Sequence, residues 1–156
     1  MVGEGEQQAE EAFAASRAER DRTLQAIHGL ETALGKAAGG DDWLAEVESG
    51  LEELETAMSD EQHELNRPDA LLAMISSGHP RRFGSRVRSL REQYDDIIRQ
   101  VASLRRQLDE PMATLGTAEL RHRAGGIIQA LHNCRARQTD LVFEALRLDL
   151  GARRHE

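Results

Sequence analysis

The sequence has little of several residue types on which common functions depend. Its 156 residues include one cysteine, three prolines, one tryptophan, one tyrosine and three phenylalanines. One cysteine, Cys134, cannot form an internal disulfide, and so few aromatics do not make a base-stacking surface or an aromatic cage. No apolar run is long enough to cross a membrane, and the acidic residues 1–6 do not resemble a signal peptide. We therefore expect one domain in the cytoplasm.

Basic charge is also in short supply. The chain has 28 Asp and Glu against 20 Lys and Arg, which gives a formal net charge of -8 at pH 7. Because phosphate contacts need basic residues, we predict neither nucleic acid nor a membrane as partner, and keep a partner protein or a second copy of the chain as candidates. Arginines crowd residues 81–106, and we expect them to pair with the acidic segment 46–55 or with an acidic partner protein.

The hydrophobic pattern predicts an all-α fold. Apolar residues recur in steps of three and four, and the β-branched clusters typical of strands are missing. Short connections between long helices favour an up-down-up-down antiparallel four-helix bundle over residues 13–151. Residues 1–12 offer little to a core and are predicted to be a flexible extension, and residues 152–156 a tail. The expected helices are 6–38, 41–67, 80–110 and 117–151, with a short apolar helix near 70–75 between the second and third.

A few polar residues interrupt these apolar seams. Glu61 interrupts the second helix and Tyr94 the third, while Cys134 and Gln138 lie one turn apart on the fourth. Asp21 lies on the inward face expected for the first helix. Counting along each helix at ~1.5 Å per residue places these five side chains at a similar depth. The sequence therefore predicts a polar layer inside the bundle.

This polar layer has two interpretations. Buried polar residues can fix the register of packed helices through hydrogen bonds. Helical bundles also build metal and ligand sites in their cores. Dimetal sites take several histidines and carboxylates, and the predicted layer contains no histidine, so the hydrogen-bonded layer is favoured. No cofactor is predicted, with non-haem iron as the alternative.

Three stretches of the sequence resemble the hemerythrin-like (HHE) domain family. They are residues 51–72, where the second helix leads into the short apolar turn, residues 80–94, and residues 134–151. The resemblance implies a four-helix bundle. It also implies a non-haem di-iron centre, held by histidines and carboxylates from four helices and used for oxygen binding or redox sensing.

Most positions that this resemblance assigns to metal ligands carry other residue types. Glu61 and Tyr94 stand where the second and third helices of the family offer a histidine, and Cys134 and Gln138 fall on the fourth-helix histidine and the acid after it. Asp21 stands near the first-helix ligand level. The resemblance thus implies an eroded metal site in a non-catalytic binding or regulatory module. The alternatives are a metal-binding oxygen or redox protein with an altered ligand set, and a structural oligomer.

His28 is a further candidate ligand. Counting along the helices places it level with Gly125 and Gly126 of the fourth helix. Glycines inside a helix cost about 1 kcal/mol each relative to alanine, which suggests that this pair makes room for a neighbour. We expect His28 to pack into the notch that the glycines leave, with a ligand pocket as the alternative.

Overall fold

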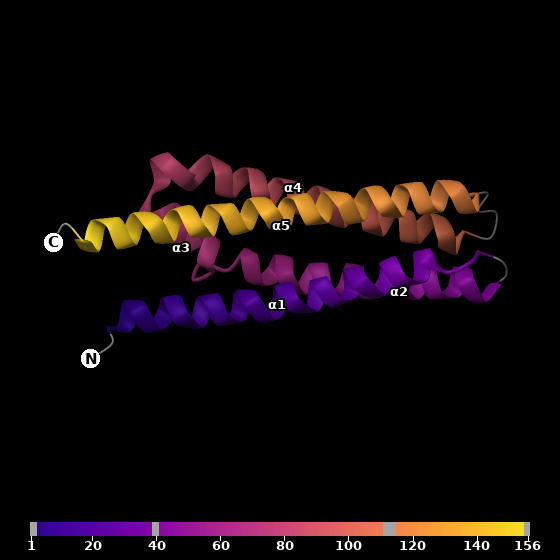
Figure 1. The fold of residues 1–156 in the computed structure, drawn as a ribbon, viewed down its shortest axis with the longest axis horizontal. Helices are drawn as coiled ribbons and strands as arrows, with labels where there is room; N and C mark the ends of the chain where they lie inside the picture. Colours follow the sequence, from indigo (N-terminus) through magenta and orange to yellow (C-terminus); the bar gives the residue numbers. More distant parts are fainter. Residues whose placement is uncertain (1–2, 39–40, 111–114, 155–156) are drawn as a thin grey trace.

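The structure is a computed structural model that describes residues 3–38, 41–110 and 115–154. These residues form five α-helices and no strand, which confirms the predicted all-α class. Four long helices lie along the longest axis of the molecule, and the short α3 lies near the end that holds both termini (Figure 1). The helices are α1 (Glu4–Gly35), α2 (Asp41–Leu65), α3 (Leu71–Gly78), α4 (Pro80–Asp109) and α5 (Thr117–Arg154).

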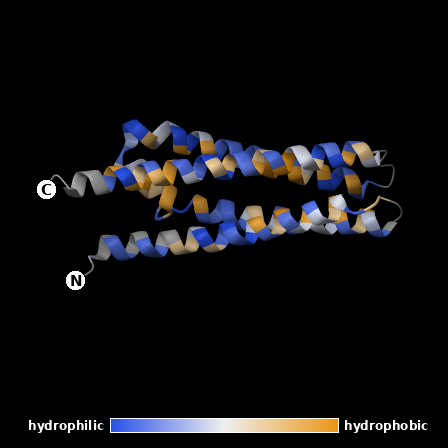
Figure 2. Ribbon diagram, viewed as in Figure 1, coloured by the Kyte–Doolittle hydropathy of each residue, from blue (hydrophilic) through white to orange (hydrophobic). Residues whose placement is uncertain are grey.

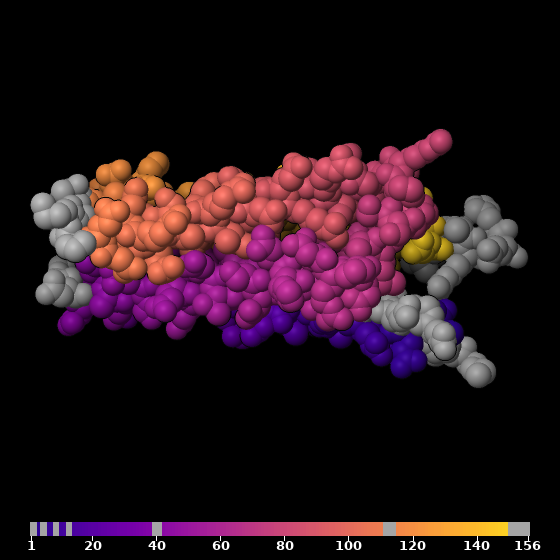
Figure 3. Space-filling model, turned by 180° about the vertical axis from the view of Figure 1, so that it is seen from behind, coloured from indigo at the N-terminus to yellow at the C-terminus, as the bar shows by residue number. Residues whose placement is uncertain are grey.

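The long helices pack on one another unequally. Helix α1 packs along α2, α2 also packs against α4, and α4 packs against α5. Seen from behind, α2 and α4 lie side by side and form one face of the molecule (Figure 3). Helices α1 and α5 approach each other more loosely. We call the approach of these two helices the α1–α5 seam.

Apolar stripes on the helices meet in one core (Figure 2). Helix α4 shows the rule, because its buried residues recur in steps of three and four, as the sequence pattern predicts. Burying one large apolar side chain stabilises a fold by roughly 1.5–3 kcal/mol, so this repeat fixes which face of α4 points inward. The buried residues of α4 are Phe83, Val87, Leu90, Tyr94, Ile97, Val101 and Leu104.

The helix ends differ from the predicted ones by a few residues. Helix α1 begins at Glu4 and α5 ends at Arg154, so both helices reach into the segments predicted to be an extension and a tail. Residues 6–12 are rich in Ala, Glu and Gln, which favour helix without needing a core contact. Pro80 lies in the first turn of α4, where its missing N–H costs nothing.

The contact between α1 and α2 is close because one glycine lies in it. A Cβ placed on Gly50 would come 3.1 Å from Leu30 Cδ1, which is tighter than ordinary van der Waals contact. Nearer the loop, the Trp43 indole Nε1–H donates a hydrogen bond of 2.9 Å to the Ala33 carbonyl oxygen. These two contacts hold α2 against α1 and so set the position of α1 relative to the rest of the core.

The expected notch for His28 is wrong. His28, Gly125 and Gly126 are all exposed, and a Cβ on either glycine would meet no other atom within 4 Å. Counting residues gives a position along a helix axis, whereas the direction around the axis decides which residues face a neighbour. Since α1 and α5 approach only loosely, both faces are left to solvent.

We expect Gly125→Ala and Gly126→Ala each to raise the free energy of unfolding by about 1 kcal/mol, because alanine favours a helix and no neighbour is crowded. Urea denaturation followed by circular dichroism measures the change. Gly50→Ala is the matched control and should gain less or lose stability, since its methyl group meets Leu30. A loss of stability in Gly125→Ala would show that this position is packed.

Candidate functional site

A carboxylate on α2 is hydrogen-bonded in the core by residues from two other helices. The Tyr94 hydroxyl of α4 donates to Glu61 Oε2 at 2.6 Å, and the Thr23 hydroxyl of α1 lies 2.7 Å from the same oxygen. Glu61 is 2% exposed, Tyr94 5% and Thr23 0%. The predicted burial of Glu61 and Tyr94 at one level is confirmed, and we call the three residues the Glu61 network.

Local sequence explains why these side chains point inward. Glu61 follows Met58 by three residues and precedes Leu65 by four, and both of these neighbours are buried. It therefore lies on the apolar seam of α2, where water does not reach it. A buried carboxylate without partners costs several kcal/mol, so the donors from α1 and α4 are needed for this seam to pack.

The hydrogen bonds of the Glu61 network can accommodate either protonation state of the carboxyl group. Thr23 Oγ1 lies 2.7 Å from Glu61 Oε2 and 3.1 Å from the backbone carbonyl oxygen of Glu19, one turn earlier on α1. A hydroxyl has one proton to donate. An ionised Glu61 accepts from Tyr94 and Thr23. A neutral Glu61 can instead donate to Thr23, which then donates to the Glu19 carbonyl, while Tyr94 still donates to Glu61.

Two neighbouring acidic groups are kept in their neutral forms. Burial, followed by the negative charge of Glu61 and the hydrogen bond to it, raises the pKa of Tyr94 well above its ordinary value. Burial, followed by the charge of Glu61, raises the pKa of the Cys134 thiol to about 11. Tyr94 therefore acts as a hydrogen-bond donor, and Cys134 is a buried thiol rather than a reactive thiolate.

Of the other residues predicted for the polar layer, one is buried and one is exposed. Gln138 is buried, as expected, but within the described part of the chain it makes no hydrogen bond to another side chain. Asp21 is exposed, so its predicted place in the layer is wrong. Residues two apart on a helix point about 200° away from each other, and α1 turns Thr23 inward. The signal for Thr23 was its spacing of four and seven residues from the buried Ile27 and Leu30.

The buried polar groups do not fit a di-iron centre. The layer offers one carboxylate, one phenol and one thiol, whereas such centres in bundles take several carboxylates and histidines. Glu61 is already bound by two protein donors, and His28 lies on the surface. Among residues 3–38, 41–110 and 115–154, no cluster of three or more His, Cys, Asp or Glu is arranged to hold a metal ion.

A groove runs over the surface between α1 and α2. It consists of a hollow of about 580 Å³ and a second of about 230 Å³, which share Ser49 and Glu53. Two of its acidic residues are paired across the groove, Glu46 with Lys36 at 3.0 Å and Asp60 with Arg22 at 3.7 Å. Glu52 and Glu53 make no ion pair with any described residue. We call this feature the acidic groove.

Three arginines of α4 bind partners on different elements of the fold. Arg105 pairs with Glu55 of α2, as the sequence predicts. Arg86 instead pairs with Glu144 of α5 at 2.6 Å, and Arg91 donates to the Leu65 carbonyl oxygen at 3.2 Å. The predicted pairing of this face with the acidic second helix is thus only partly confirmed.

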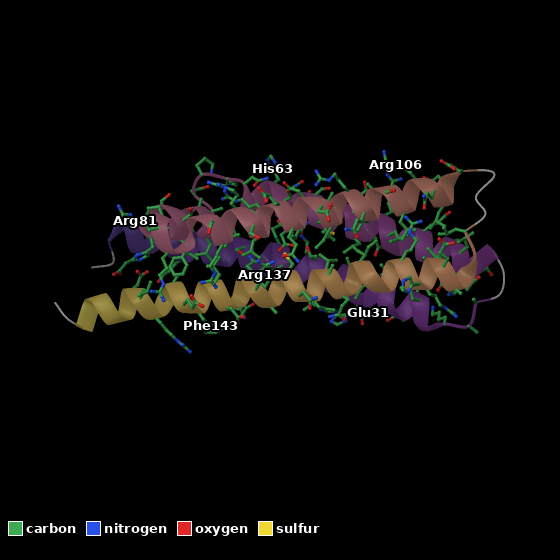
Figure 4. The ribbon with its side chains drawn as sticks, turned by 90° about the horizontal axis from the view of Figure 1, so that it is seen from above. Glu31, His63, Arg81, Arg106, Arg137 and Phe143 are labelled. Carbon is green, nitrogen blue, oxygen red and sulfur yellow. The ribbon has the colours of Figure 1, made fainter. Side chains whose placement is uncertain are left out.

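One side of helix α5 is hydrogen-bonded to α4, and another side exposes apolar residues to solvent. Arg137 lies between α4 and α5 and donates to Gln93 at 2.6 Å, whereas Phe143 lies on the outer side of α5 (Figure 4). Phe143 is 59% exposed and Leu146 48%. Such a pair of exposed apolar residues is compatible with the structural oligomer considered from the sequence, which stays a prediction.

No protein-family model, no curated protein and no solved structure matches the chain. None of the helices in the described residues is long and apolar enough to cross a membrane. The hemerythrin-like resemblance stays a prediction.

Replacing Tyr94 by Phe should lower the free energy of unfolding by about 1–3 kcal/mol, because Glu61 loses one of its two donors. Thr23→Val removes the other donor at nearly constant shape. Both together should cost more than the sum of the single changes, since the carboxylate is then left without a donor. Glu61→Gln is the control: with its amide oxygen in the place of Oε2 it can still accept from both Tyr94 and Thr23, so we expect a smaller loss. Unchanged urea midpoints in Tyr94→Phe would contradict the role given to this bond.

The stability of the fold should fall at alkaline pH. The Cys134 pKa is raised from 9.0 to about 11, so the folded chain holds its proton where the unfolded chain has lost it. This contribution is complete below pH 9 and is lost as the pH rises through about 11; its size is about 3 kcal/mol. Cys134→Ala should flatten the dependence of unfolding free energy on pH in this window. An equally steep fall in the variant would assign it to other groups.

Proposed function

We propose that the chain is a non-catalytic, antiparallel four-helix bundle of the hemerythrin-like type that acts by binding a partner protein. The observation that carries this proposal is that Tyr94 and Thr23 both donate hydrogen bonds to the Glu61 carboxylate. The position at which a bundle of this type would hold its metal is filled by a hydrogen-bonded network of the protein itself. In this proposal the function resides on the surface, where a partner protein can bind.

The chemistry of the core supports a structural role. Glu61, Tyr94 and Cys134 are each at most 5% exposed, so a substrate in solution does not reach them. The pKa values of Tyr94 and Cys134 are raised, which makes the phenol and the thiol poor nucleophiles and poor bases at neutral pH. A nucleophile or base that acts on a dissolved substrate needs access to it and a lower pKa.

The acidic groove is the surface that suits a partner best. Side chains of α1 and α2 line it, and the small residues Ala26 and Ala57 are among them. A helix with an apolar stripe can lie in such a groove, as in other helix-in-groove complexes. Glu52 and Glu53, which have no internal ion-pair partner among the described residues, favour Lys or Arg on that helix. The partner we infer is therefore a basic amphipathic helix.

A titration with a Lys-rich amphipathic peptide tests this proposal. We expect the backbone amide resonances of residues 46–60 to shift, and the affinity to fall as salt is added. Glu53→Lys should weaken binding by roughly three- to tenfold, because it puts a like charge against the peptide. Asp140→Lys, an exposed change of equal charge on α5, is the matched control and should have less effect. Equal loss in both variants would reduce the interaction to net charge and contradict the groove.

One observation favours a second candidate, a metal-binding redox protein with an altered ligand set. Glu61 lies near enough to Tyr94 and Cys134 for its charge to raise both of their pKa values, so three groups from three helices share one place in the core. Metal analysis of protein purified without an affinity tag separates the two candidates. We expect less than stoichiometric iron, manganese and zinc. A stoichiometric amount of any of them would replace the first proposal by the second.

A further inference from the structure

A small cavity on the α1–α5 seam is rich in arginine. It has a volume of about 230 Å³ and lies where α1, α3 and α5 meet, away from the acidic groove. Three positively charged residues and one hydroxyl line it, together with a single carboxylate and the apolar Leu71. The lining residues are Ser16, Arg17, Arg20, Asp21, Leu71 and Arg135.

Two of these arginines are held in place by the backbone and side chains of the opposite helix. Arg20 of α1 donates from Nη2 to Thr139 Oγ1 of α5 at 3.0 Å. Arg135 of α5 donates from Nη1 to the backbone carbonyl oxygen of Arg20 at 3.0 Å. Each guanidinium is thereby fixed at one nitrogen, and other N–H groups remain for a further acceptor. The two helices thus bring two oriented cations to one cavity.

The charge of this pair is not neutralised by an ion pair inside the protein. Neither Arg20 nor Arg135 makes an ion pair with a carboxylate in the part of the chain that the structure describes. The Arg20 Nε–H is buried and has no hydrogen-bond partner among the described residues. Burial, followed by the nearby charge of Arg135, lowers the pKa of Arg20. Close like charges and a buried donor without an acceptor both cost free energy that a bound anion would recover.

Two acidic groups act in the opposite direction. The charges of Glu61 and Asp21 both raise the Arg20 pKa, but less than burial and Arg135 lower it. Glu61 is committed to Tyr94 and Thr23. Asp21 is exposed in the lining of the cavity and would repel an incoming anion. It is therefore the residue that limits anion affinity.

We propose that this cavity binds a small phosphate-type oxyanion, either inorganic phosphate or a phosphomonoester. The fork of an arginine matches a tetrahedral oxyanion through paired charge-assisted hydrogen bonds, and two arginines on facing helices can hold it from both sides. Ser16 adds a hydroxyl to the lining. A bound oxyanion would join α1 to α5, two helices that pack only loosely on each other.

Titration of the full chain with inorganic phosphate, at constant ionic strength set with chloride, tests the proposal. We expect saturable binding by calorimetry, and a shift of the Arg20 Nε–H resonance that chloride alone does not cause. Arg20→Gln and Arg135→Gln should each weaken binding by about tenfold or more, the usual loss for a charge-assisted hydrogen bond. Asp21→Asn should tighten binding severalfold. Glycerol phosphate in place of phosphate shows whether the cavity admits an ester.

Arg88→Gln provides the matched control, because it removes one exposed arginine from α4 and should leave phosphate binding unchanged. Arg20→Lys keeps the charge but not the fork, and a large loss of affinity in it would support the bidentate geometry. Far-ultraviolet circular dichroism identifies any variant that fails to fold, and Asp21→Asn then still tests the site. The proposal is wrong if phosphate does not bind at millimolar concentration, if chloride competes equally, or if Arg20→Gln and Arg135→Gln bind phosphate as tightly as the control Arg88→Gln.

Discussion

A carboxylate placed among apolar side chains must find hydrogen-bond donors within the protein, and this requirement constrains the whole core. Glu61 finds one donor on α1 and another on α4. Moving either helix by one residue would rotate its hydroxyl by about 100° and remove it from the carboxylate. Apolar residues alone tolerate such shifts more readily, because their contacts have no direction. The three-helix register is therefore more sharply specified than apolar packing would make it.

Specificity of this kind has a cost in stability. Replacing a buried ionisable group by a well-packed apolar one is often neutral or stabilising in proteins. At position 61 an apolar residue would extend the seam that Met58 and Leu65 already form. The chain instead carries a glutamate together with the tyrosine and threonine that satisfy it. This loss of stability is consistent with a core in which the alignment of α1, α2 and α4 matters more than the largest possible stability.

The sequence predicts the parts of this structure that depend on periodicity. Steps of three and four identify the inward face of each helix, so the burial of Glu61, Tyr94 and Cys134 could be predicted. Position along a helix follows from counting residues. Direction around a helix is lost where the seam is weak, as in α1, where Asp21 is the predicted inward residue and Thr23 is the buried one. A short hydroxyl satisfies a buried acceptor at lower desolvation cost than a charged group, which accounts for the difference.

Surface features were harder to predict, since they depend on how helices approach. Gly125 and Gly126 suggest a close contact, yet among the described residues the glycine at which two helices meet closely is Gly50, whose neighbour Leu30 lies on the preceding helix. A net charge of -8 likewise hides a cavity that gathers arginines from α1 and α5. Charges more than about 8 Å apart are largely screened at physiological ionic strength, so local arrangement decides what such a cavity attracts.

The α1–α5 seam is joined mainly by polar contacts, among them Arg121 to the Lys36 carbonyl at 2.8 Å and His132 to Glu31 at 3.1 Å. Hydrogen bonds at the surface can be exchanged for water at little cost, whereas the apolar contacts of α2 with α4 cannot. The two helix pairs, α1–α2 and α4–α5, are therefore held together mainly where α2 packs on α4, and only weakly along the α1–α5 seam. Amide hydrogens along the α1–α5 seam would exchange with solvent first, and a ligand that binds both helices would slow their exchange.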